Sequence, residues 1–367
     1  MRIVHLSDIH LSNDNYLEFK NNFRDALIAD LVNYNNHIKI DVIVITGDLV
    51  DKGGDSLYEI KGFEDKSKYK SPYYIFEEIF IQPIINALNF SKDNFLFIPG
   101  NHDVNENNIF LREEYKLYNE LTLENCEKYL KDNLTYKYSE RIKEFKEFER
   151  YFHEKNNKYF FTENESTYTY EFNNKKIGFL LINDSWRCRS IKFKDEDDKI
   201  YFGKQQLYDG YEKLKRNETK INIVLFHHPP SSFYEENEII GFLNRKEDVD
   251  VLLFGHYHSS QSYNYITHSG GCFYLRSKAS FLKPDEKDLD YIPGYQIIDI
   301  DVDFYKIIKI EHKRYNNKPD SKAFIFDNTI GDIGIDKNKF SGNTGYSFSK
   351  RIENSDFKKF NKEDFKS

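Results

Sequence analysis

The stretch Asp41-Val-Ile-Val-Ile-Thr-Gly-Asp48 decides how this chain is expected to fold. Its apolar run is typical of a buried β-strand, and a tight turn and a carboxylate follow directly. The same arrangement, a short apolar run that leads into His, Asp or Asn, recurs at residues 2–10, 94–103, 221–228 and 250–258. Side chains that follow the ends of neighbouring strands meet at one rim of an open sheet. The sequence therefore predicts an α/β fold with a polar site at this rim.

The five clusters are Asp8-Ile-His10, Gly47-Asp48, Gly100-Asn-His-Asp103, His227-His228 and Gly255-His-Tyr-His258. They offer imidazole, carboxylate and amide groups but no thiolate, and this ligand set suits Mn, Fe, Zn, Ni or Co. Two such ions held about 3.5–4 Å apart can ionise a water nucleophile and neutralise a phosphate. The clusters therefore predict a dinuclear site that hydrolyses phosphoesters.

In this order the clusters resemble the signature blocks of the calcineurin-like metallophosphoesterase superfamily over residues 3–258. The resemblance implies a two-sheet αββα sandwich, here with a helical insert, and two divalent metal ions, with Mn and Fe as the expected pair. A strand that ends in Asp184-Ser185, then Gly203-Lys-Gln-Gln-Leu207, then His227-His-Pro-Pro230 is similar to the bacterial cyclic-nucleotide phosphodiesterase-like branch.

Seven residues match the metal ligands of the superfamily: Asp8, His10, Asp48, Asn101, His227, His256 and His258. The resemblance implies that Asp8, His10 and His258 hold one ion. It places Asn101, His227 and His256 on the other ion, with Asp48 as the bridge.

His102 would lie just outside the metals, and the resemblance implies that it contacts the substrate and protonates the leaving oxygen. Asn101 would also engage the phosphate. Asp51 and Asp103 are both near His102 in sequence, and either carboxylate could orient the imidazole. Asp51 matches the position that has this role in the phosphoprotein-phosphatase branch. Lys52 stands where that branch has a phosphate-binding arginine, and lysine lacks the bidentate fork.

Other histidines and arginines are interpreted as structural. His5 is expected to pack within the first strand, and His228 to support a ligand or pack in its loop. Four histidines without a motif partner are expected at the surface or hydrogen-bonded: His37, His153, His268 and His312. Arg187 and Arg189 could reach a phosphate, although exposure is the more common state of arginine on a polar loop.

The chain of 367 residues is expected to hold a metallophosphoesterase domain at 1–315 and a polar tail or linker at 316–367. Apolar spacing predicts a helix over 73–88 that is broken or kinked at Pro83. Residues 105–162 form an insert in which 113–150 predict two or three amphipathic helices, either a cap over the metals or a solvated decoration. Strands between 272 and 315 are expected to complete the second sheet.

The charge, the cysteine count and the apolar runs of the chain limit which partners and which cellular setting we expect. A net charge of −8, from 61 acidic and 53 basic residues, gives no support to broad binding of nucleic acid, which depends on clustered Lys and Arg. Three cysteines make a disulfide framework improbable, and no apolar run is long enough to span a membrane. With the first motif directly after Met1 and no room for a cleavable signal, we expect a cytoplasmic protein without membrane attachment.

The sequence thus predicts a phosphoesterase that uses a metal-bridging hydroxide, with nucleotides or related diesters as the favoured substrates. A DNA or RNA nuclease, a phosphomonoesterase and a protein phosphatase are the enzymatic alternatives. A metal-binding interaction scaffold without catalysis is the alternative of another class, although members of that kind typically lack a ligand or the acid histidine.

Overall fold

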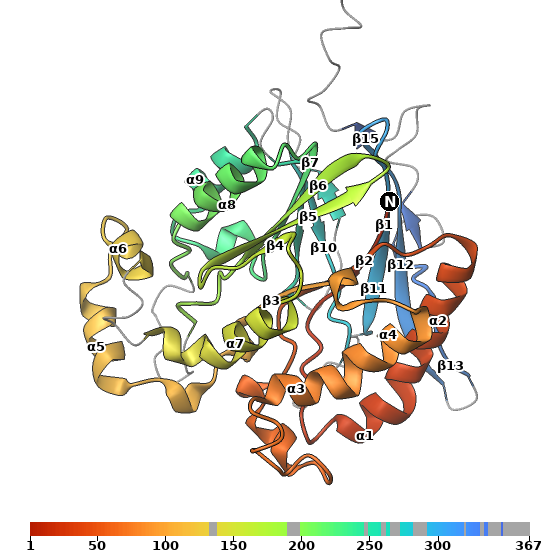
Figure 1. The fold of residues 1–367 in the computed structure, drawn as a ribbon, viewed down its shortest axis with the longest axis horizontal. Coiled ribbons are helices and arrows are strands. Elements are labelled where there is room, and N and C mark those ends of the chain that lie inside the picture. Colours follow the sequence, from red (N-terminus) through yellow and green to blue (C-terminus); the bar gives the residue numbers. More distant parts are fainter. Residues whose placement is uncertain are drawn as a thin grey trace, which may run out of the picture.

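The chain folds into two β-sheets that pack face to face, with helices on both outer faces (Figure 1). The computed structural model describes residues 1–131, 138–188, 199–245, 249–257, 262–264, 272–281, 292–318, 321–330, 334–336 and 346–347. This four-layer arrangement confirms the predicted αββα sandwich.

The first sheet has the strand order β13-β12-β11-β1-β2-β3. Its strands are β1 (Arg2–Leu6), β2 (Val42–Thr46), β3 (Phe95–Ile98), β11 (Gly294–Asp301), β12 (Lys306–Lys318) and β13 (Ser321–Phe326). The short strands β14 (Ile335–Asp336) and β15 (Tyr346–Ser347) pair with β12. Strands β1, β2 and β3 run parallel, so the clusters that follow them emerge at one edge.

The second sheet has the order β4-β5-β6-β7-β8-β10-β9. Its strands are β4 (Tyr159–Phe160), β5 (Glu165–Phe172), β6 (Lys175–Ile182), β7 (Ile221–Leu225), β8 (Val251–Phe254), β9 (Ser262–Asn264) and β10 (Phe273–Arg276). Strands β6, β7 and β8 are parallel, and β7 and β8 lead into the remaining two clusters.

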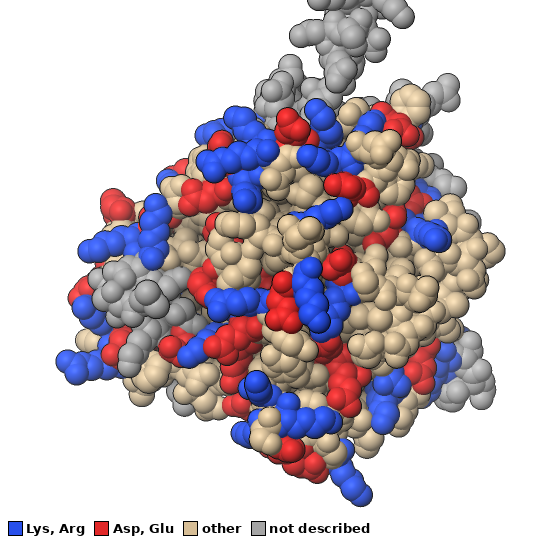
Figure 2. Space-filling view, in the orientation of Figure 1, with Lys and Arg blue, Asp and Glu red and all other residues tan. Residues whose placement is uncertain are grey.

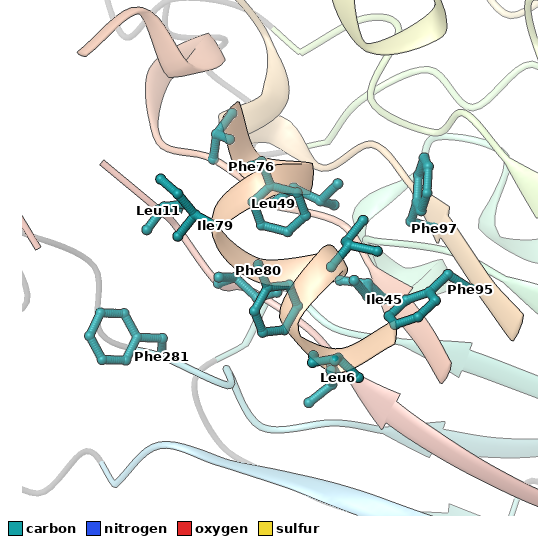
Figure 3. Close-up of a cluster of buried hydrophobic side chains, with 14 of the residues drawn as sticks. Leu6, Leu11, Ile45, Leu49, Phe76, Ile79, Phe80, Phe95, Phe97 and Phe281 are labelled. Carbon is teal, nitrogen blue, oxygen red and sulfur yellow. The ribbon is translucent and has the colours of Figure 1, made fainter. Parts of the chain in front are cut away.

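Every residue of β1 and β2 is buried, because both faces of the sheet are covered. Alternate side chains, such as Ile3 and Val44, join the core between the sheets, which Phe179 and Ile223 enter from the second sheet. The opposite faces meet the helices. Figure 3 shows the outer face of the first sheet, where these labelled side chains pack together: Leu6, Ile45, Phe76, Ile79, Phe80, Phe95 and Phe97.

Helices α1 (Tyr16–Glu18), α2 (Arg24–His37), α3 (Pro72–Phe76) and α4 (Gln82–Leu88) lie on the first sheet, and α8 (Gln205–Arg216) and α9 (Glu236–Leu243) on the second (Figure 1). The break predicted at Pro83 is a π-helical turn over Glu77–Ile81 between α3 and α4. Proline has no N–H for the carbonyl of Ile79 four residues earlier, and Arg24 Nη1 donates to that oxygen at 3.3 Å.

The predicted helical insert contains α5 (Leu111–Glu120), α6 (Cys126–Lys131) and α7 (Lys143–Phe152). Phe148 of α7 stacks on Phe97 of the first sheet, with ring centroids 5.4 Å apart. Leu130 of α6 packs with Trp186, which lies in the loop after β6 of the second sheet. The insert therefore contacts both halves of the sandwich.

One expectation about the C-terminal strands is wrong. Within the part of 272–315 that the structure describes, β10 joins the second sheet, whereas β11 lies antiparallel to β1 in the first, with Arg2 opposite Asp299. The domain boundary expected at residue 315 falls inside β12, and Phe324 of β13 is buried against Phe23 and Tyr295. Among the helices that the structure describes, none has the length and apolarity needed to cross a membrane.

Candidate metal centre

Four donor atoms from different strand ends converge on one point. His227 Nε2 lies 3.0 Å from Asn101 Oδ1, 3.3 Å from His256 Nδ1 and 3.3 Å from Asp48 Oδ2. All four residues were nominated from the sequence. They come from the loops after β2, β3, β7 and β8, so both sheets contribute to the cluster.

The tautomer of His227 makes this cluster fit a cation. Its Nδ1 lies 2.8 Å from the Thr46 carbonyl, an acceptor, so Nδ1 carries the proton and the lone pair of Nε2 points toward the Asp48 and Asn101 oxygens. Lone pairs that face one another repel unless a proton or a metal ion lies between them. Burial lowers the pKa of His256 well below its ordinary value, so that ring is neutral as ligation requires.

Asp8 and His10 form a second group beside the first. Asp8 Oδ2 accepts hydrogen bonds from Ser7 Oγ and from the His256 backbone N–H, while Oδ1 lies 3.8 Å from His10 Nε2. These contacts hold Asp8 and His10, both nominated from the sequence, side by side in the loop after β1. His258, nominated for this group, lies outside the described residues.

Asp48 lies between the two groups. Its Oδ1 accepts from the His102 backbone N–H at 2.6 Å, and its Oδ2 is 3.7 Å from His10 Nε2 and 3.3 Å from His227 Nε2. Burial would raise the pKa of Asp48, but the neighbouring imidazoles hold it well below its ordinary value. Burial disfavours a charged His227, yet Asp48 raises the pKa of His227 to about 10, so a proton and a metal ion compete for this position.

His102 is oriented by Asp51. Its Nδ1 lies 2.7 Å from Asp51 Oδ1, and its ring meets the His10 ring edge-on at a centroid distance of 4.5 Å. Burial would raise the pKa of Asp51, but the hydrogen bond and charge of His102 lower it. Asp103, the other candidate, instead accepts from the backbone N–H groups of Gly100, Leu49 and Val50 and thereby fixes two site loops to each other.

The backbone at the centre adopts conformations that side chains disfavour. Asp8, His10, Asp48 and His256 all have positive φ, between 50° and 69°. Such residues concentrate at functional sites, because the surrounding structure must hold them there. Gly47 has φ of 91°, and a Cβ on it would lie 2.3 Å from His227 Nδ1, so glycine is required beside this ligand.

Asp184 is a supporting residue to which the sequence assigned no role. Its Oδ2 accepts from the backbone N–H groups of His227 and His228, and its Oδ1 lies 3.2 Å from His228 Nδ1. The available signal was its position directly after β6, equivalent to the clusters after the neighbouring strands. His228 is thus tied to Asp184, and its ring lies 4.4 Å from the His256 ring.

The remaining histidines and arginines considered from the sequence lie outside the centre. His5 is buried in β1 between Thr46 and Gln296, as predicted. His37 is exposed, His312 is buried, and His268 and Arg189 lie outside the described residues. The expected exposure of Arg187 is wrong, because its guanidinium is buried on Glu114. His153 is neither exposed nor hydrogen-bonded within the described chain, and its ring stacks on Tyr159.

Two facing sheets with a buried His, Asp and Asn cluster at their parallel strand ends define a protein of the metallophosphoesterase class. The sequence signature of the calcineurin-like phosphoesterases matches residues 1–260. The chain therefore belongs to the calcineurin-like phosphoesterase family, a class of phosphoester hydrolases with a dinuclear divalent metal centre.

The individual proteins that are similar to this chain share little sequence identity with it. The chain is 23% identical over 308 residues to an uncharacterized metallophosphoesterase-like protein, YydB, of Bacillus subtilis, and the match covers 83% of this chain and 57% of that protein. Among solved structures, a dimetal phosphatase from Danio rerio aligns with a TM-score of 0.43 at 11% identity, over 89% of this chain and 98% of the other. The Haemophilus influenzae NAD nucleotidase aligns with a TM-score of 0.41 at 14% identity, over 89% and 53%.

Proposed function

We propose that the protein is a dinuclear metal-dependent phosphoesterase that prefers nucleotides or related diesters. The observation that carries this proposal is Asp48 Oδ2, which lies between His10 and His227, one from each ligand group. Asp8, His10 and His258 would hold one ion, and Asn101, His227 and His256 the other, with Asp48 shared. A Mn or Fe pair suits these ligands, and when bound it supplies an ionised water nucleophile and positive charge for the phosphate.

His102 has the geometry of a general acid. Its Nδ1 is engaged by Asp51, which favours the protonated ring and holds it in place. The ring is part-exposed, so its other nitrogen can give a proton to the leaving oxygen of a bound ester. Asn101, next to it, can contact the phosphate as well as a metal ion.

Tyr257 supports a nucleotide as the substrate. It stands next to His256, its side chain is 44% exposed, and the two rings lie 5.3 Å apart. The Arg276 guanidinium lies 5.2 Å from the Tyr257 ring centroid and braces the ring from within the protein. An exposed aromatic ring at this distance from the centre suits stacking of a nucleobase while its phosphate is at the metals.

The other functions fit less well. Figure 2 shows Lys and Arg interspersed with Asp and Glu across the face in view, whereas a nuclease is expected to have a continuous basic groove. A scaffold that binds partners without catalysis would not need the His102–Asp51 pair.

Hydrolysis assays with metal-stripped protein resupplied with Mn²⁺ test the proposal. The substrates are 3′,5′- and 2′,3′-cyclic nucleotides, a p-nitrophenyl diester, a p-nitrophenyl monoester and single- and double-stranded DNA. We expect metal-dependent cleavage of diesters that Asp48→Ala abolishes, and Tyr257→Ala should raise KM for the nucleotides but not for the p-nitrophenyl diester. Preferred cleavage of DNA or monoesters would refute the substrate class, and failure to bind two ions would refute the centre.

A further inference from the structure

The helical insert is joined to the body of the protein by a buried ion cluster. Glu114 of α5 accepts from Arg187 Nη1 at 2.5 Å through one oxygen and from Arg141 Nη2 through the other. Each of the three residues is at most 5% exposed. Glu114 and Arg141 belong to the insert, whereas Arg187 belongs to the loop after β6, so the cluster spans the junction between them.

This cluster reaches the metal centre in three contacts. Arg141 Nη1 donates to the Cys188 carbonyl at 2.8 Å, and Cys188 Sγ lies 3.8 Å from His228 Nε2. The His228 ring in turn packs on the ring of His256, a nominated ligand. Arg141 also fixes the start of the insert, because the N–H of Asn105, three residues after His102, donates to the Arg141 carbonyl at 2.8 Å.

The chemistry of the cluster suits positioning better than stabilisation. Burial would raise the pKa of Glu114, but the two guanidinium groups hold it below its ordinary value, so the carboxylate is ionised. Burying such charges costs nearly as much as their attraction returns, so a buried cluster adds little net stability. Its paired, charge-assisted hydrogen bonds are strongly directional, however, and fix the angle between the groups that they join.

We propose that Glu114 is a positioning residue of the metal centre, which holds His228 and thereby His256 in place through Arg141 and Cys188. The helical insert is then part of the centre, and loss of the Glu114 contacts weakens the ion that Asn101, His227 and His256 would hold. This inference rests on the proposed function, because it requires that the centre binds two ions.

Titration of metal-stripped protein with Mn²⁺ tests the coupling. Calorimetry gives the affinity of each ion, and electron paramagnetic resonance distinguishes a coupled Mn²⁺ pair from single ions. Glu114→Gln should weaken one of the two ions by about tenfold, the lower end of the effect of removing a supporting partner. Glu113→Gln is the matched control, since the neighbouring Glu113 is exposed on the same helix, and it should bind both ions like the wild type.

Two further variants separate positioning from folding. Cys188→Ala removes the Sγ contact with His228 and should weaken the same ion, and combining it with Glu114→Gln should add no further loss, because both act on one path. Glu114→Asp keeps the buried charge but shortens its reach, and serves in the same titration if Glu114→Gln does not fold. Unchanged affinity for both ions in the folded Glu114 variant would overturn the inference while leaving the proposed function intact. A wild-type protein that binds fewer than two ions would overturn both.

Discussion

Replacing Asp51 with asparagine tests how far His102 acts as an acid. The variant keeps the size of the side chain but removes the charge that faces His102 Nδ1 at 2.7 Å. With charge centres about 4 Å apart, the attraction is about 1 kcal/mol in water and about 4 kcal/mol at an effective dielectric constant of 20. The His102 and Asp51 side chains are 16% and 8% exposed. We therefore expect the protonated ring to lose about 2–3 kcal/mol of stabilisation, between these two limits.

That loss should depend on the leaving group. An alkoxide must receive a proton as it departs, so kcat for an alkyl ester should fall about 30- to 150-fold, which is about 2–3 kcal/mol in the barrier. A p-nitrophenolate departs without a proton, and its kcat should fall less than about threefold. The assay compares both esters at saturating substrate, with metal content measured for each preparation.

Asp14→Asn is the control, because Asp14 is exposed four residues after His10 and undergoes the same chemical change. It should leave both rates unchanged. Equal losses for the two esters in Asp51→Asn, with both ions still bound, would show that Asp51 acts on something other than proton donation, and the role assigned to His102 would be refuted.

Three other perturbations address the bridge, the backbone and a buried histidine. Asp48→Ala should remove both ions, measured by metal analysis of the purified protein, and retention of two ions would rule out the bridge. Gly47→Ala should lower the free energy of unfolding by more than the about 1–3 kcal/mol of a strained backbone, because its Cβ would also meet His227. Gly62 has a similar φ and open space around it, so urea unfolding of Gly62→Ala measures the backbone cost alone. Burial lowers the pKa of His153 to about 3, so the folded protein binds this proton less readily than the unfolded chain and stability falls as pH drops below about 6.5. His153→Phe should therefore gain about 2 kcal/mol more relative to the wild type at pH 5 than at pH 7.5, and an equal difference at the two pH values would exclude this source of acid sensitivity.

Residues that directly follow a strand could be predicted well from the sequence. The run Arg2–Leu6 is β1 as expected, and the runs before Asp48 and Asn101 match β2 and β3 to within one residue. A buried parallel strand is a continuous apolar run, so its end is visible in the sequence. The polar residue after that end is then placed by the sheet, which explains why the nominated ligands that the structure describes lie together.

Contacts between segments that are far apart in the chain could not be predicted from local sequence patterns. The pairing of β11 with β1 joins residues about 300 positions apart, and alternating hydrophobicity shows that a strand forms but not which strand it joins. Arg187 was likewise expected on the surface, because its burial depends on Glu114 and Arg141 from an insert that precedes it by many residues. The local sequence around Arg187 carries no sign of either partner.

The ligands of the metal centre are held in unfavourable conformations by hydrogen bonds from neighbouring residues. Four nominated ligands have left-handed backbones, and the donor atoms of Asp48, Asn101, His227 and His256 face one another, so the centre by itself opposes the folded state. Groups with ordinary conformations and complete hydrogen bonds surround it: Asp103 joins two loops, and Asp184 holds the backbone of His227. Asp103 and Asp184 thus bind the backbone of the loops that carry Asp48, Asn101 and His227, and these hydrogen bonds offset part of the cost of bringing the ligands together.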